Sequence, residues 1–369
     1  MLPRFPLDTW VMKPLVRKFI SWALVHLGLL DLLIVLNRLR GRRLMILGLH
    51  RVKDPTEDPT TVGLINLYVS ETNLEALIRY LRRRFRIISM NEYVEAAAAE
   101  TSMPGNCAVL TFDDGYNDFM TGAAPILSRQ SAPGTLFVAS GRNATRSPAW
   151  WDLAYNLLSR LTSEHRPVVV DKLQTLVAPE LLPEALFDAR EGHRELKQRS
   201  IVSLIRELQT YDDEKRQAVM DALRVVVPID LEEFQESNRF VSDDELVELS
   251  RAEIDVQGHT VTHSFLTELS NEAIEEELRV SKEELERLLD KEIVGFAYPG
   301  GRHSPDARRL VEQCGYRYGV TIDFGLNSKR SDPFELKRIM VSDDVLTNHD
   351  REFDAKAFAW LYLRATLAR

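Results

Sequence analysis

The chain has 369 residues, of which 44% are hydrophobic, so it is long enough to bury a large core. Its formal net charge is −9 at pH 7, from 47 basic and 56 acidic residues. This balance argues against general binding to nucleic acid, which needs a basic face to displace counterions. Cys107 and Cys314 have no metal-binding or redox spacing, and we expect buried free thiols.

An apolar segment lies near the N-terminus, from Phe19 to Leu36, and Lys and Arg residues flank it on both sides within residues 13–43. A membrane-spanning helix needs about 20 apolar residues, and Asp31 inside the segment opposes insertion. No small-residue cleavage site of a signal peptide follows it. We therefore expect residues 1–43 to form a helix at the inner-membrane surface, with basic flanks against anionic lipid. A spanning helix and a helix packed on the protein are the alternatives.

Short apolar runs then alternate with amphipathic stretches. Strands are predicted at 44–50, 86–90, 108–112, 134–140, 254–258, 294–298, 318–322 and 337–341. Helices are predicted where apolar residues recur every three or four positions, at 74–81, 201–208, 219–226, 242–249, 272–289 and 306–314. The alternation predicts a mainly parallel sheet, open or closed into a barrel. Strand-like runs are scarce between 141 and 240, which predicts a helical insertion between two barrel segments, 44–140 and 241–345, with a C-terminal helix in 346–369.

Polar, metal-capable side chains follow three of the predicted strands. Asp113 and Asp114 end the strand at 108–112, His259 and His263 follow the strand at 254–258, and Tyr298-Pro299-Gly300-Gly301 ends the strand at 294–298. Each feature alone is more often a turn or a surface group. Because the carboxyl ends of barrel strands share one face, we expect the three to converge.

Two imidazoles and one carboxylate form a donor set that suits Zn²⁺ or another divalent first-row ion and leaves positions open for water and substrate. Asp114, His259 and His263 would supply this set. The neighbouring Asp113 would then serve as a general base.

The sequences TFDDGY at 111–116, GHTVTH at 258–263 and FAYPGG at 296–301, in that order, resemble the motifs of NodB-like polysaccharide deacetylases, carbohydrate esterase family four. The resemblance covers about 44–140 and 240–345, and it implies a distorted (β/α) barrel of the NodB-homology type. It also implies hydrolysis of an N-acetyl group on an amino sugar to acetate and a free amine. The segment LGLHRV and the tryptophan-containing insertion resemble the branch found in bacterial exopolysaccharide and surface-glycan clusters.

The resemblance also implies roles for single residues. Asp113 matches the catalytic base. The metal ligands are matched by Asp114, His259 and His263, with Zn²⁺ as the expected ion and Co²⁺, Ni²⁺ or Mn²⁺ as alternatives. The backbone N–H near Tyr116 matches the group that holds the oxyanion. Pro299 and Gly300, which follow Tyr298 in the third motif, match one wall of the substrate groove. From the residues alone, His50 and Trp151 are further candidates for contact with the substrate.

Two positions depart from the family pattern. The family's Arg before the proline of the third motif is Ala297 here, so we expect Arg338, on a late strand, to orient the base. The family's general-acid His lies late in the chain, where His349 is the candidate and His303 a competitor. His50 ends the first strand and either lines the site or is a packed strand-end residue.

The insertion begins with Trp150 and Trp151, which either stack on sugar rings or anchor the insertion. The leading function is removal of N-acetyl groups from a bacterial polysaccharide or lipid-linked glycan at the cytoplasmic face of the inner membrane. The alternatives are a non-catalytic glycan-binding module on a deacetylase fold, and a peptidoglycan or chitooligosaccharide deacetylase.

Overall fold

The computed structural model describes residues 14–368 apart from 57, 59, 99–104, 143–147, 163, 166, 167, 169, 170, 172–197, 210 and 212. The chain divides into two compact units. The barrel unit comprises Pro3–Asp54, Asn66–Thr145 and Phe240–Arg369. The helical unit comprises Pro55–Ile65 and Arg146–Arg239. The segment Pro55–Ile65 lies outside the predicted insertion but belongs to the helical unit.

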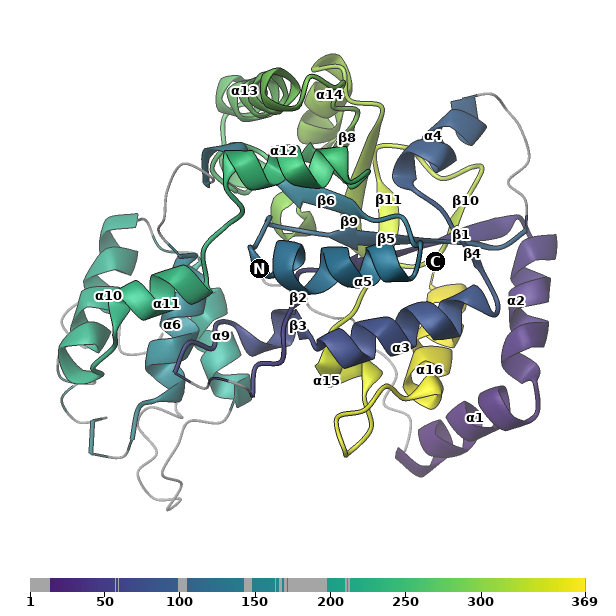
Figure 1. The fold of residues 1–369 in the computed structure, drawn as a ribbon, viewed down its shortest axis with the longest axis horizontal. Coiled ribbons are helices and arrows are strands. Elements are labelled where there is room, and N and C mark those ends of the chain that lie inside the picture. The colour runs from purple at the N-terminus through teal and green to yellow at the C-terminus, as the bar shows by residue number, and fades with distance from the viewer. Residues whose placement is uncertain are drawn as a thin grey trace. The chain divides into compact units, whose positions relative to one another are not determined.

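The barrel unit is built on seven parallel strands that close into a ring, as far as the described residues show (Figure 1). Around the ring the strands are β1 (Arg42–Leu49), β5 (Cys107–Phe112), β6 (Thr135–Val138), β7 (Asp255–Gly258), β8 (Gly295–Ala297), β9 (Tyr318–Phe324) and β11 (Leu336–Met340). The ring closes because β1 pairs in parallel with both β5 and β11. The predicted distorted barrel is confirmed.

Three short strand pairings lie outside this ring. Strand β4 (Arg86–Ile87) extends β5 in parallel, and β10 (Asn327–Ser328) runs antiparallel to β1. A separate parallel pair joins β2 (Arg51–Val52) to β3 (Tyr68–Val69). The strand predicted at 86–90 is shorter than expected, because the Ser89 hydroxyl accepts the backbone N–H of Glu92 at 3.0 Å and a helix begins at Met90.

Alternation along the strands separates an inner from an outer layer, since neighbouring side chains point to opposite faces. On β1, Leu44 and Ile46 belong to the cluster inside the barrel, whereas Met45 and Leu47 pack with the surrounding helices. The helices of the barrel unit after β1 are α3 (Glu71–Arg82), α4 (Met90–Ala98), α5 (Ala124–Arg129), α12 (Asp243–Arg251), α13 (Asn271–Leu289), α14 (Pro305–Gln313), α15 (Asp343–Leu346) and α16 (Ala355–Leu367).

The helix predicted at 242–249 begins with a hydrogen-bonded cap. Helix α12 begins with the capping box of Ser242 and Glu245, in which each side chain accepts the other residue's backbone N–H.

Cys107 is buried and Cys314 is only partly buried, and both are free thiols.

The N-terminal apolar segment forms two helices, α1 (Pro14–His26) and α2 (Leu29–Leu39), rather than the single helix that we expected. Gly28 adopts a left-handed conformation with φ of 68°, and the helices bend by 80° at the break. Among the described residues no single helix is long and apolar enough to cross a membrane, and α1 and α2 meet that criterion only as a bent pair.

The described residues of the helical unit include α6 (Trp150–Ser159), α9 (Gln198–Leu208), α10 (Asp213–Val226) and α11 (Leu231–Ser237). Polar side chains tie the segment 55–65 to these helices. The Asp152 carboxylate accepts the backbone N–H of Leu64 at 2.7 Å, and the Asn156 amide donates to the carbonyl of Thr60 at 2.9 Å. The buried polar groups of α6 therefore hold the 55–65 segment inside this unit.

Candidate active site

The inner layer of the barrel continues into polar residues at the carboxyl ends of the strands. On β5, Cys107 and Val109 point inward, so Asp113 shares their face. By the same alternation Arg338 shares the face of Leu336 on β11, and His50 shares that of Leu44 and Ile46. Three polar groups far apart in sequence are therefore directed to one end of the barrel.

Asp113 and Arg338 form a buried, bidentate ion pair. Two guanidinium nitrogens of Arg338 donate to the two carboxylate oxygens of Asp113, each at 2.7 Å, and both side chains are almost fully buried. Arg338 also donates to the Thr111 hydroxyl at 3.1 Å and to the carbonyl of Thr321 at 2.8 Å. Burial alone would raise the pKa of Asp113, but Arg338, with His259 and His50, holds it below its usual value. The carboxylate is thus oriented and kept ionised.

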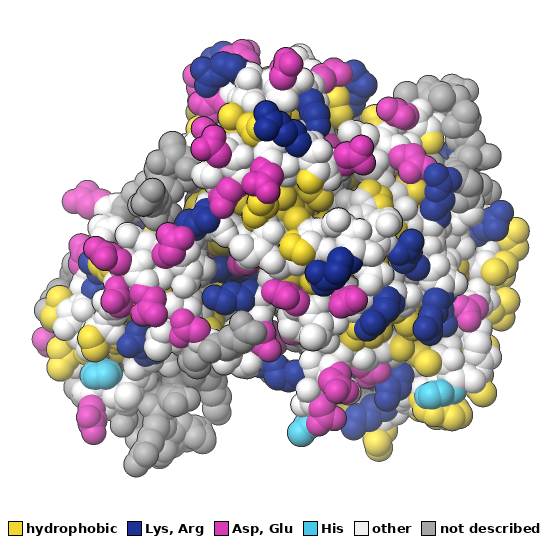
Figure 2. Space-filling view, viewed as in Figure 1, with side chains coloured by type: hydrophobic (Ala, Val, Ile, Leu, Met, Phe, Trp, Pro, Cys, Tyr) yellow, Lys and Arg dark blue, Asp and Glu magenta, His cyan; other side chains and the backbone are white. Residues whose placement is uncertain are grey.

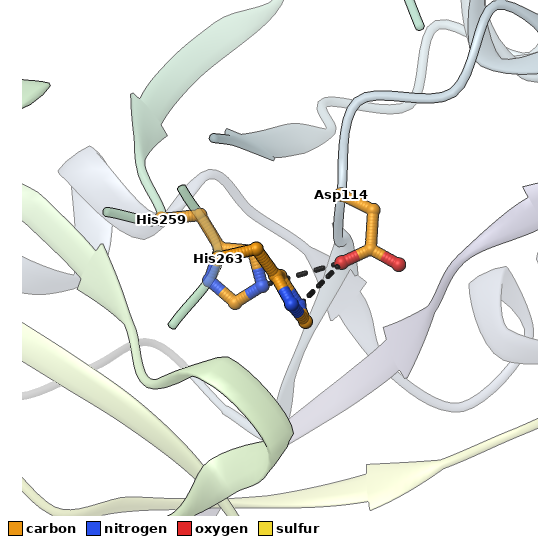
Figure 3. A group of neighbouring side chains, drawn as sticks. All are labelled: Asp114, His259 and His263. Atoms are coloured by element: carbon orange, nitrogen blue, oxygen red, sulfur yellow. Dashed lines mark ion pairs between the residues drawn. The ribbon is translucent and has the colours of Figure 1, made fainter. Parts of the chain in front are cut away.

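A second carboxylate, Asp114, meets two imidazoles (Figure 3). Its Oδ1 atom lies 3.1 Å from Nε2 of His263 and 3.4 Å from Nε2 of His259. One ligand atom from each residue lies within 4.8 Å of the others.

The hydrogen bond made by the His259 ring indicates that Asp114, His259 and His263 are arranged to bind a cation. Its Nδ1 lies 2.7 Å from the carbonyl oxygen of Ala297, which can only accept, so Nδ1 carries a proton. In the neutral ring Nε2 is then a lone pair aimed at Asp114, whose buried Oδ1 receives no hydrogen bond. A lone pair facing an anionic oxygen is unfavourable unless a cation lies between them. The donor set and its orientation therefore fit a divalent metal ion.

The backbone around these ligands is strained. Asp114, Thr260 and His263 all have positive φ angles, of 74°, 67° and 64°. Such conformations cost about 1–3 kcal/mol each in non-glycine residues and collect at functional sites. The turn after β7 is held by Glu277 of α13, whose carboxylate accepts the backbone N–H groups of Val261 at 2.8 Å and Thr262 at 3.0 Å. The strain is compensated by contacts from a neighbouring helix.

Other expected site residues lie elsewhere. Tyr298 is fully buried in the outer layer, where its ring contacts Phe296 and His303, because alternation on β8 turns it away from the barrel interior. Its side chain is therefore unavailable to a substrate, contrary to our expectation. Pro299 is buried in the turn that follows, and Gly300 there has a φ of 58°.

The general-acid residue expected late in the chain is not brought to this group. The imidazole of His349 is fully exposed in the loop between α15 and α16, where its Nδ1 lies 3.6 Å from the carboxylate of Asp350. His303 is partly buried, with Nε2 3.7 Å from Glu335. His50 follows β1 on the inward face that Leu44 and Ile46 share, at the same end of the barrel as Asp113, so it is the better candidate.

The aromatic residues expected near the substrate are both buried. The ring of Tyr116 is fully buried and stacks on Phe240 at 5.1 Å, so a substrate contact there would use its backbone N–H. Trp151 is 7% exposed and belongs to the helical unit, where it packs edge-on against Trp150 at 5.8 Å.

A buried cation beneath the first motif was not foreseen from the sequence. Arg51 follows His50, and its guanidinium lies 4.6 Å from the ring of Tyr68 and 4.4 Å from that of Tyr116. Its Nε donates to Asp118 at 2.7 Å. This pair joins the end of β1 to the loop that carries Asp113 and Asp114. In the sequence this pair is indicated by Arg51, directly after His50, and by Asp118, five residues after Asp113.

Comparison with known proteins agrees with the geometry. The family model described as polysaccharide deacetylase matches residues 100–164 and 209–319. YxkH of Bacillus subtilis (strain 168), a candidate polysaccharide deacetylase, is 26% identical over 102 residues, 28% of this chain. The chain matches 37% of the length of that relative.

Solved structures with the same fold include the Streptococcus pyogenes deacetylase PplD in complex with acetate, at 17% identity and a TM-score of 0.52, covering 82% of this chain and 93% of that one. IcaB from Ammonifex degensii has 16% identity and a TM-score of 0.52, covering 86% and 96%. At these identities the structures establish the fold. The family model and the three motifs in their order identify a polysaccharide deacetylase domain in this chain.

Proposed function

We propose that this protein is a metal-dependent hydrolase that removes N-acetyl groups from amino sugars of a glycan. The observation that carries the proposal is the pairing of two carboxylates with separate partners. Asp113 is held by Arg338, and Asp114 faces two imidazoles. Adjacent carboxylates in such different surroundings are suited to different tasks, one as base and one as ligand.

Asp114, His259 and His263 would hold the ion, for which Zn²⁺ is our first choice and Co²⁺, Ni²⁺ or Mn²⁺ alternatives. When bound, a divalent ion polarises the amide carbonyl and lowers the pKa of water. Asp113 accepts the proton of the attacking water, and Arg338 fixes the direction of its oxygens. Because the pKa of Asp113 lies below its usual value, the carboxylate is ionised at neutral pH, as a general base must be.

The leaving amine needs a proton donor, and we assign this role to His50. It is partly exposed, and it follows a strand whose inward face leads to the end of the barrel where Asp113 lies. Under this assignment His50→Gln retains its metal but loses about 10²–10⁴-fold in kcat. His349→Gln serves as the matched control and keeps its activity, since that ring is fully exposed.

The substrate is proposed as a bacterial surface polysaccharide or its lipid-linked precursor. IcaB, which shares the fold, and the acetate complex of PplD are in line with a deacetylase that releases acetate. Trp151 remains our candidate for a sugar contact from the helical unit, although its burial also suits an anchor.

Metal analysis and acetate release from N-acetylated glycans test the proposal together. Wild type is expected to bind one ion per chain and release acetate, whereas Asp113→Asn keeps the ion and loses about 10²–10⁴-fold in turnover. Asp332→Asn is the control, because that carboxylate also pairs with an arginine but lies at the surface. Bound metal without acetate release from any glycan would favour a binding module, and a fully active Asp113→Asn would mean that the base is assigned wrongly.

A further inference from the structure

The helix pair α1–α2 presents apolar side chains to solvent. We define the apolar face by six residues of the pair, Leu15, Phe19, Trp22, Leu32, Val35 and Leu39, which are between 45% and 80% exposed. Apart from α1, α2 and the turn between them, Leu367 is the single exposed large hydrophobic residue among the described residues of the barrel unit. Figure 2 shows hydrophobic side chains along the right edge, where α2 lies in Figure 1. The exposure is therefore concentrated on one pair of helices.

This arrangement is the reverse of a helix that faces water, which places polar residues outward. Helix α3 of the same unit has the usual pattern, with Glu71, Arg79 and Arg82 on its exposed side. Helices α1 and α2 are also apolar on their inner side, where Leu24 and Ile34 join the core of the barrel unit. An outward apolar face on a helix that is already packed requires a second apolar partner.

Polar contacts fix the pair on the barrel. The side-chain amide of Asn37 donates to the Thr366 hydroxyl of α16 at 2.7 Å. Asp31, the acid that opposes a spanning helix, pairs with Arg84 at 2.7 Å. Asp31 is thus neutralised by the protein and does not weaken the apolar face.

A positively charged pocket adjoins the apolar face, between α1 and the start of α16. Its charged lining consists of three cations and one carboxylate, Arg17, Lys18, Lys356 and Asp354. Two aromatic residues of the apolar face, Phe19 and Trp22, also line it. The Nζ atom of Lys356 lies 4.0 Å from a carboxylate oxygen of Asp354. The guanidinium of Arg17 lies over the ring of Trp360, 5.8 Å from its centroid. The excess of cations fits phosphate groups.

We propose that α1 and α2 form a membrane-docking surface, whose apolar face enters the interfacial layer of an anionic phospholipid bilayer while the pocket of Arg17, Lys18 and Lys356 binds lipid phosphates. Aromatic and aliphatic side chains flanked by Lys and Arg are the composition of helices that lie in this layer. Charge complementarity selects an anionic bilayer over a neutral surface. The inference does not depend on the deacetylase chemistry.

Vesicle flotation with the full chain tests the apolar face. Wild type is expected to float with vesicles of phosphatidylcholine mixed with phosphatidylglycerol, and Phe19→Gln/Leu32→Gln is expected to stay unbound with an unchanged circular dichroism spectrum. Val225→Gln is the matched control, because that side chain is 71% exposed but lies on α10. It should float like wild type.

A second set of variants tests the pocket. Arg17→Gln/Lys18→Gln/Lys356→Gln should weaken binding to the mixed vesicles by about five-fold for each cation removed. Arg279→Gln/Arg309→Gln/Arg317→Gln removes the same charge from exposed positions elsewhere and should bind like wild type.

Three outcomes would overturn the proposal. Wild type could remain unbound with mixed vesicles, or the Phe19→Gln/Leu32→Gln protein could float as wild type does. A wild-type dimer that this variant converts to a monomer, without flotation, would show that a second copy covers the face. Acetate release from a soluble glycan is expected to be unchanged in every variant, so failure here and failure of the proposed activity are distinguishable.

Discussion

Replacing Arg338 by Met removes the partner of a buried carboxylate without opening a large cavity. Arg338 is fully buried and gives Asp113 two hydrogen bonds of 2.7 Å. Breaking a buried ion pair from one side costs about 3–5 kcal/mol. Protonation of Asp113 sets a limit on this cost: neutralising a carboxyl of ordinary pKa 3.9 at pH 7 takes about 4 kcal/mol. The two values agree, so we expect a loss near 4 kcal/mol at pH 7.

The sign of the pH dependence follows from the pKa of Asp113. In the wild-type protein the pKa of Asp113 is lower in the folded state than in the unfolded state. The ionised carboxylate therefore stabilises the fold above the unfolded-state pKa, and this stabilisation is lost as the pH falls through the folded-state pKa. In the Arg338→Met variant no arginine opposes the effect of burial on Asp113. The pKa of Asp113 in the folded state therefore rises above its value in the unfolded state. The variant therefore regains stability as pH falls, and the difference from wild type shrinks by about 1.4 kcal/mol per pH unit between pH 7 and pH 5.

Urea denaturation of the metal-free proteins across this pH range measures the difference. The double variant Asp113→Asn/Arg338→Met should recover most of the lost stability, because no buried charge is left without a partner. Arg308→Met is the matched control: Arg308 also donates twice to Asp332, at 2.9 and 3.1 Å, but the pair is partly exposed, so the loss should stay below about 1 kcal/mol. A loss that does not vary with pH, or that Asp113→Asn leaves unchanged, would refute the reasoning.

Three other variants test the surroundings of the site. Arg51→Met leaves Asp118 buried without its guanidinium and should cost about 3–5 kcal/mol in urea denaturation; a loss under about 1 kcal/mol would contradict the role of this pair. Glu277→Ala releases the turn after β7 and should weaken metal affinity about 10–100-fold in a chelator competition assay, whereas Glu276→Ala, exposed on the same helix, should not. Gly300→Ala adds a methyl group at a positive φ and 2.6 Å from a phenyl ring, so the melting temperature should fall; an unchanged melting temperature would contradict the strain.

The sequence was most informative where strands alternate. The inner positions Leu44, Ile46 and Val109 follow period two, and continuing that period places Asp113 inward. The same rule, applied to β8, would have placed Tyr298 outward with Phe296, whereas its position in the third motif suggested contact with the substrate. Alternation is thus the better guide to where a side chain points.

Other features depend on contacts between distant parts of the chain. The pairing of Arg338 with Asp113 joins strands far apart in sequence, and it could be suggested only from the missing arginine at Ala297. His349 is the candidate general acid by its late position in the chain. Position in the sequence does not determine exposure, and the loop that contains His349 places its side chain in solvent. The bend at Gly28 could not be distinguished from an ordinary glycine within a helix.

The central claim is that one ion, held by Asp114, His259 and His263, is required for release of acetate. The most direct measurement is acetate release from an N-acetylated glycan by metal-stripped protein during titration with Zn²⁺. We expect no activity before addition, a linear rise with added Zn²⁺, and saturation at one equivalent per chain, with no rise in His263→Ala. Full activity in the stripped protein, or an equal response from His263→Ala, would contradict it.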